Sequence, residues 1–142
     1  MAEKTSAHKI ATQHQLIGSL FAGLARALSA RNGGTAQRKI VGLRRVLDAH
    51  FLLEEEHYFP DMRDQRPDRA ADLDRLVEEH VSMRKRAEEI LARLGQAKSE
   101  SEWETGSESE SETDWETAAV AFDSLRSLFE DHEASERQLV GS

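Results

Sequence analysis

Apolar residues recur every three or four positions in four separate stretches of the chain, with polar residues between them. The stretches run from Ile10 to Leu28, from Leu43 to Leu53, from Leu73 to Leu94 and from Ala118 to Leu139. This spacing places the apolar side chains on one face of a helix, so it predicts four amphipathic helices. Alanine, leucine, glutamate and arginine dominate the chain and only two prolines occur, a composition that also favours helix.

Turn and capping residues predict where these helices begin and end. Glycine commonly ends a helix, so we expect the first helix to stop before Asn32-Gly33-Gly34. We expect the second helix to end before Pro60, and the third to carry Pro67 in its first turn, where a missing N–H costs nothing. Thr113 and Glu116 fit a capping box at the start of the fourth helix. With short connections, the sequence predicts an all-α, up-down-up-down antiparallel four-helix bundle.

A tract rich in serine and glutamate, at about 97–113, separates the third and fourth stretches. This composition buries too little apolar area to order itself, so we expect a solvated acidic loop within a single domain spanning residues 1–142. The alternative is a regulatory segment that docks a protein partner. The stretch from Ser99 to Thr117 holds eight acids and no base, which accounts for the whole formal net charge of −8. The remainder has no net positive charge, which argues against a nucleic-acid partner.

Two features missing from the sequence restrict the class of protein. The chain has no cysteine, so a metal ion can be held only by nitrogen and oxygen ligands, which excludes iron–sulfur and most structural zinc sites. The sequence contains no run of eighteen apolar residues, and its start lacks the basic and apolar segments of a signal peptide. We therefore expect a cytoplasmic protein that does not insert into a membrane.

Ionisable residues interrupt the apolar stripe of every predicted helix. The six candidate metal ligands are His14, His50, Glu54, His80, His132 and Glu136. Each glutamate follows a histidine by four residues, so the two side chains share a helical face. A carboxylate in an apolar core costs several kcal/mol unless it is paired or binds a cation, and no lysine or arginine shares its stripe.

The depth of the four histidines in the bundle agrees with a common site. In an antiparallel bundle, the starts of the first and third helices lie beside the ends of the second and fourth. Counted from that end, the histidines fall within about two helical turns of one another. Imidazole and carboxylate ligands suit iron, manganese or zinc, and two histidines per ion with two bridging glutamates fit a pair of ions.

Other polar residues near these positions receive different predictions. Tyr58 lies one turn beyond Glu54, and we favour an aromatic that closes the bundle end over a phenolate ligand. The two remaining histidines are expected to be solvated, and three further glutamates are expected to be surface groups or hydrogen-bond partners of ligands. These residues are His8, His57, Glu55, Glu56 and Glu79.

Three segments of the chain resemble the hemerythrin-like, or HHE cation-binding, family. They are HFLLEEEHYFP around His50, EEH at His80 and HEASE at His132. The resemblance implies a non-heme diiron centre, in which two iron ions share an oxo or hydroxo bridge and two bridging carboxylates. It also implies a small-molecule ligand such as dioxygen or peroxide. Oxygen-carrying members have a second histidine where this chain has Leu76 and an aspartate where it has Glu136, so the chain resembles the non-carrier branch.

Three functions follow from this sequence. The first is a diiron oxidoreductase that reacts with dioxygen, peroxide or a related small molecule. The second is an iron or oxygen sensor whose metal occupancy controls recognition of a protein partner through the acidic tract. The third is a metal-free helical interaction module, which the two inward glutamates argue against. The sequence leaves the substrate and the physiological metal open.

Overall fold

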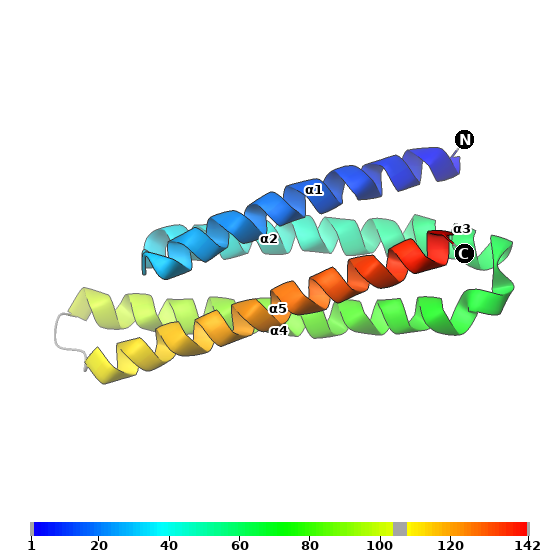
Figure 1. Cartoon of the computed structure of the whole chain (residues 1–142). Helices are drawn as coiled ribbons and strands as arrows, with labels where there is room; N and C mark the ends of the chain where they lie inside the picture. Colours follow the sequence, from blue (N-terminus) through cyan, green and yellow to red (C-terminus); the bar gives the residue numbers. More distant parts are fainter. Residues whose placement is uncertain (1, 104–107, 142) are drawn as a thin grey trace.

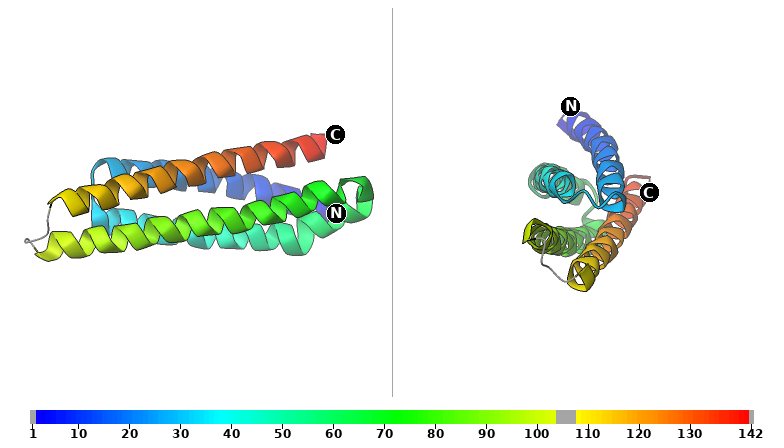
Figure 2. Two further views of the ribbon diagram at one scale, coloured as in Figure 1. Left: turned by 90° about the horizontal axis from the view of Figure 1, so that it is seen from below. Right: turned by 90° about the vertical axis from the view of Figure 1, so that its left-hand side faces the viewer.

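The chain folds into long helices that run back and forth along one axis (Figure 1). A computed structural model describes the backbone of residues 2–103 and 108–141, and the side chains of residues 11–95 and 114–139. Its elements are α1 (Ala2–Ser29), α2 (Gly33–Leu53), the π-helical turn η1 (Glu54–Tyr58), α3 (Phe59–Gln65), the 3-10 turn η2 (Pro67–Arg69), α4 (Ala70–Trp103) and α5 (Glu108–Gly141). Seen along the axis, α1, α2, α4 and α5 surround a common centre (Figure 2). The predicted all-α four-helix bundle is confirmed.

Two apolar clusters of unequal size fill the bundle. The larger cluster, formed by residues such as Phe21, Leu43 and Leu125, occupies most of its length. The smaller cluster lies at the other side of the ionisable residues, and its buried members are Phe59, Leu73, Leu76 and Leu139. The ionisable residues lie between the two clusters along α4 and α5, so the candidate site is a polar layer inside an apolar bundle. Within the described residues, every helix is too short or too polar to cross a lipid bilayer.

The connection between α1 and α2 differs from the glycine stop predicted there. Arg31 takes the left-handed conformation with a φ of 54°. The N–H groups of Arg31 and Asn32 then bond back to the carbonyls of Leu28 and Ala27, each at 3.1 Å, which is a Schellman ending. The side chain of Asn32 accepts a hydrogen bond from the N–H of Thr35 and caps α2. The helix stops where predicted, but the two glycines form the first turn of the next helix.

The second helix does not end before Pro60, so that prediction is wrong. The chain continues through η1, where the N–H of Phe59 bonds to the carbonyl of Glu54 five residues back, and then into α3. A π turn adds one residue to the helical circuit. The wider turn directly precedes Pro60 and relieves the clash that a proline ring makes inside a regular helix. The helix therefore extends to Gln65, and Pro67 opens the turn that leads into α4.

The helices on both sides of the acidic tract are longer than predicted. α4 continues to Trp103 and α5 begins at Glu108, so Thr113 lies inside α5 instead of capping its start. Glutamate is a good helix former, which lets both helices extend beyond their packed segments. The predicted loop at 97–113 is helical over most of its length, and its central part, 104–107, lies outside the described residues.

Candidate metal centre

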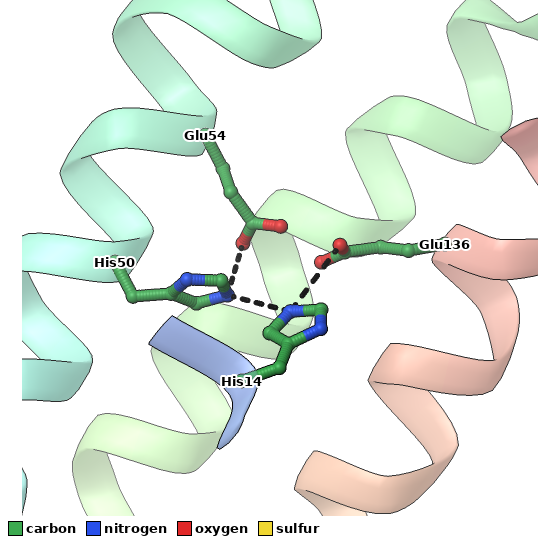
Figure 3. Close-up of side chains that lie close together, drawn as sticks. All are labelled: His14, His50, Glu54 and Glu136. Carbon is green, nitrogen blue, oxygen red and sulfur yellow. Dashed lines mark hydrogen bonds and ion pairs between the residues drawn. The ribbon is translucent and has the colours of Figure 1, made fainter. Parts of the chain in front are cut away.

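All six predicted ligands meet in the polar layer, and each of the four long helices contributes at least one of them. His14 comes from α1, His50 from α2, Glu54 from η1, His80 from α4, and His132 and Glu136 from α5. Figure 3 shows four of these side chains pointing toward one another, with Glu136 approaching from α5 and Glu54 from η1. Five of the six are at most 4% exposed, whereas the side chain of His14 is 18% exposed.

The histidines form two pairs whose inner nitrogens face each other. The Nε2 atoms of His14 and His50 are 3.2 Å apart, and those of His80 and His132 are also 3.2 Å apart. Two nitrogens bound to one ion at about 2.1 Å, with an angle of about 90–110° between them, lie about 3.0–3.4 Å apart. Each pair therefore has the spacing of two ligands on one metal ion.

Glu54 lies between the two histidine pairs. Its Oε1 atom is 2.9 Å from the Nε2 of His80 and 3.4 Å from the Nε2 of His50. The candidate ligand atoms form one group with His14, His50, Glu54 and Glu136 and a second group with Glu54, His80 and His132, each within 4.8 Å. The Oε2 atom of Glu54 is buried and accepts no hydrogen bond from the described part of the chain. A buried acceptor without a donor fits a position that a cation fills.

The carboxylate of Glu136 also reaches both pairs. Its Oε1 atom is 2.6 Å from the Nε2 of His132, and its Oε2 atom is 3.8 Å from the Nε2 of His14. The two oxygens thus point to different histidine pairs. With Glu54, this arrangement gives two carboxylates that can each link two ions, and the nitrogen and oxygen donors fit iron, manganese or zinc.

The outer nitrogen of each histidine faces an oxygen from a neighbouring helix. His50 Nδ1 donates to Gln13 Oε1 at 2.9 Å. His80 Nδ1 donates to Glu55 Oε2 at 2.6 Å, and His132 Nδ1 donates to Glu79 Oε1 at 2.7 Å. The Nδ1 of His14 lies 3.8 Å from Glu133 Oε1, beyond hydrogen-bond distance. Such acceptors fix the ring orientation and keep the inner nitrogen directed at the metal position.

These four residues, three of which accept a hydrogen bond, form a ring around the bundle. Each one directly adjoins a ligand in the sequence but contacts the ligand of the next helix: α1 supplies Gln13 to α2, η1 supplies Glu55 to α4, α4 supplies Glu79 to α5, and α5 supplies Glu133 to α1. The last contact is the longest. Sequence reasoning placed Glu55 and Glu79 as surface groups or hydrogen-bond partners, and it missed Gln13 and Glu133. Their position beside a ligand was the available signal.

Aromatic rings hold some of the histidines more firmly than others. His80 stacks on Phe51, at 4.0 Å and 15°, and on Phe59, at 5.8 Å and 17°. Among the described side chains, His14 makes edge contacts alone, with His50 and with Phe129. The ring of His80 therefore has two stacking partners, and that of His14 has none among these side chains.

The buried histidines His50 and His80 are neutral at physiological pH. Burial lowers the pKa of His50 to about 3 and that of His80 to about 2. Because the Nδ1 atom of each ring carries the proton that it donates, the Nε2 atom presents a lone pair to the layer. A neutral imidazole with an inward lone pair is the form that binds a metal ion.

The remaining buried groups share protons in the metal-free chain. Burial raises the pKa of Glu54 well above its ordinary value, and the neighbouring Glu136 carboxyl adds to the increase. Burial opposes the ionisation of Glu136, but the interactions with Glu54 and His132 outweigh it and lower its pKa to about 2. Burial also disfavours the charged form of His132, but the interactions with Glu136 and Glu54 raise its pKa to about 10. Glu54 and His132 therefore hold the protons that a bound cation would displace.

The other residues considered from the sequence lie outside this set. Tyr58 is half-buried, packs beside Phe59 at the edge of the smaller apolar cluster, and has a pKa raised to about 12 by burial. His57 and Glu56 are exposed, and the side chain of His8 lies outside the described residues. Leu76, where oxygen carriers have a histidine, is buried in the smaller cluster.

Comparison with known proteins gives one match. Searches of curated proteins and of solved structures find no significant match. The profile of the Hemerythrin HHE cation binding domain matches residues 5–141. This match includes every ligand of the polar layer and covers nearly the whole chain, so the chain belongs to the hemerythrin HHE cation-binding domain family.

Proposed function

We propose that the polar layer binds two iron ions, one between His14 and His50 and the other between His80 and His132, bridged by Glu54 and Glu136. The observation that carries the proposal is the pairing of the inner nitrogens at 3.2 Å on both sides of a shared carboxylate. Two irons held by these six side chains would supply electrons and a binding position for a small molecule. The protein then handles dioxygen, peroxide or a related small molecule.

The surrounding residues prepare the layer for this chemistry. Glu55, Glu79 and Gln13 hold three rings with their inner nitrogens unprotonated when the rings are neutral. The two apolar clusters on either side exclude bulk water from the reacting atoms. Leu76 contributes no ligand atom, so the layer has fewer donors than that of an oxygen carrier, and a bound ion would keep a coordination position for an external molecule.

The test is the iron content and reactivity of the purified chain. We expect about two irons per chain, near-ultraviolet charge-transfer absorption, and repeated consumption of peroxide or dioxygen in the presence of a reductant. A His50→Ala, Glu54→Ala double variant should lose the irons and the absorption. A His57→Ala variant is the matched control, because that histidine is exposed and lies close in sequence. Substoichiometric metal that survives in the double variant would refute the proposal.

A second candidate function is an iron or oxygen sensor, and the four-helix origin of the ligands favours it. Because every long helix contributes a ligand, metal occupancy stabilises the whole bundle and changes what a partner can recognise. A sensor binds its small molecule once and then changes partner affinity, whereas an oxidoreductase turns over many times. Counting the moles of peroxide consumed per mole of protein separates the two functions.

A further inference from the structure

The two histidine pairs have different surroundings, and each difference favours metal binding by His80 and His132. We propose that the position between His80 and His132, called the inner position, binds its metal ion more tightly and fills first. The position between His14 and His50, called the outer position, fills second and exchanges its ion more readily. This inference rests on the proposed two-metal function and adds an order of loading to it.

The acceptors behind the histidines differ in charge and distance. At the inner position, two carboxylates accept hydrogen bonds from the Nδ1 atoms of the histidines. Glu55 accepts at 2.6 Å and Glu79 at 2.7 Å. At the outer position, the acceptors are the neutral amide of Gln13 at 2.9 Å and the carboxylate of Glu133 at 3.8 Å. A charged acceptor makes a shorter and stronger hydrogen bond and fixes the orientation of the ring more firmly. The inner histidines are therefore the better-oriented metal donors.

Burial and packing also favour the inner position. Both inner histidines are fully buried, whereas the side chain of His14 is 18% exposed. Figures 1 and 2 show the start of α1 leaning away from the other helices. Arg84 supports the inner position, because its guanidinium lies 3.6 Å from Glu55 and 5.1 Å from the ring centre of Phe51, which stacks on His80. The inner ligands are thus held in place before an ion arrives.

The shared carboxylates also lie closer to the inner pair. Glu54 Oε1 is 2.9 Å from His80 Nε2 but 3.4 Å from His50 Nε2. Glu136 Oε1 is 2.6 Å from His132 Nε2, while its Oε2 is 3.8 Å from His14 Nε2. Two carboxylates are grouped with His14 and His50, but only one with His80 and His132, which by number would favour the outer position. The distances favour the inner position instead, because the nearest carboxylate oxygens face the inner histidines.

The charge of the ligand set separates the two binding events further. Glu54 and Glu136 are the only two carboxylates among the six candidate ligands, so a first divalent ion balances their charge once the proton on Glu54 is displaced. The second ion enters a layer whose ligand charge is already balanced, and it repels the first ion at short range. Loading is therefore stepwise, with the outer position second.

Zinc titration of the metal-free chain tests the order, with calorimetry for affinity and nuclear magnetic resonance of the imidazole nitrogens for position. We expect two binding events whose dissociation constants differ by at least about tenfold. Hydrogen-bond partners of metal-binding histidines change affinity by this much. The first equivalent should shift the ring nitrogens of His80 and His132, and only the second should shift those of the outer pair. His14→Ala should remove the second event and leave the first.

Variants of the acceptors test the cause. The Glu55→Gln, Glu79→Gln double variant should weaken the first event by about 10–100-fold, because both charged acceptors become neutral amides of the same shape. Glu56→Gln is the matched control, since Glu56 is exposed beside Glu55. Gln13→Glu should tighten the second event and narrow the gap between the two, and it tests the same cause if the double variant fails to fold.

The outcomes distinguish this inference from the proposed function. Two ions that fill the outer position first, or both positions in parallel, would overturn the order and leave the dinuclear centre intact. Binding of fewer than two ions would overturn both. Acceptor variants that leave both affinities unchanged would refute the role given to Glu55 and Glu79.

Discussion

Replacing Glu54 with glutamine should stabilise the metal-free chain while it removes metal binding. Glu54 is fully buried, and its pKa lies well above its ordinary value of 4.5 because burial disfavours the carboxylate. The folded chain therefore takes up a proton that the unfolded chain does not hold above pH 4.5. Stability from such a group is present below pH 4.5 and is lost as the pH rises. Glutamine resembles the protonated acid and does not incur this loss.

The expected magnitude follows from the pH interval. Each pH unit between the ordinary pKa and the working pH costs about 1.4 kcal/mol while the folded side chain stays protonated. At pH 6, an interval of about 1.5 units corresponds to about 2 kcal/mol. The Glu54→Gln variant should exceed the wild type by this free energy of unfolding at pH 6 and match it at pH 4. For a chain of this size, the gain is about 4–8 °C in melting temperature.

Urea unfolding of both proteins in the presence of a chelator, at pH 4, 5 and 6, measures this difference. Taking the difference between the two proteins cancels the titration of the groups that do not contact Glu54. The control is Glu56→Gln, which changes an exposed glutamate in the same turn and should give no pH-dependent difference. A Glu54→Gln difference that is constant across this range, or that falls with rising pH, would refute the account of burial at Glu54.

Three further predictions concern the centre and the first turn. Metal binding at neutral pH should release about two protons, from Glu54 and His132, and calorimetry in buffers of different ionisation enthalpy measures the number. Removing the metal with a chelator should lower the free energy of unfolding by about 3 kcal/mol for each ion that is present at one hundred times its dissociation constant, as measured by urea unfolding. Arg31→Gly should raise the melting temperature through about 1 kcal/mol of stability, because glycine adopts a positive φ without strain; an unchanged or lower melting temperature would contradict this.

Helical periodicity was sufficient to predict the bundle and the convergence of the six candidate ligands. His14 and His132 lie far apart in the chain, but an antiparallel bundle brings residues of similar depth together, and the structure places both in one layer. The family match is independent of this geometry and agrees with it. Whether these residues bind iron stays a prediction.

Features that depend on the geometry between helices could not be predicted in this way. Gln13 and Glu133 lie next to ligands, and a helical wheel turns them away from the core, yet they reach a histidine on the neighbouring helix. The π turn at Glu54 has no periodic signal, because one added residue shifts the pattern only locally. The sequence therefore predicts a helix end before Pro60, where the structure continues the helix.

The ring of acceptors has a consequence for how the chain reaches its final form. Because Gln13 serves α2, Glu55 serves α4, Glu79 serves α5 and Glu133 serves α1, no pair of adjacent helices contains a complete set of oriented ligands. A nascent α1–α2 hairpin holds one oriented histidine, and the set is complete only when α5 has docked. If these residues bind metal as proposed, we expect strong metal capture only after the whole chain has folded, so an occupied centre would mark a finished molecule.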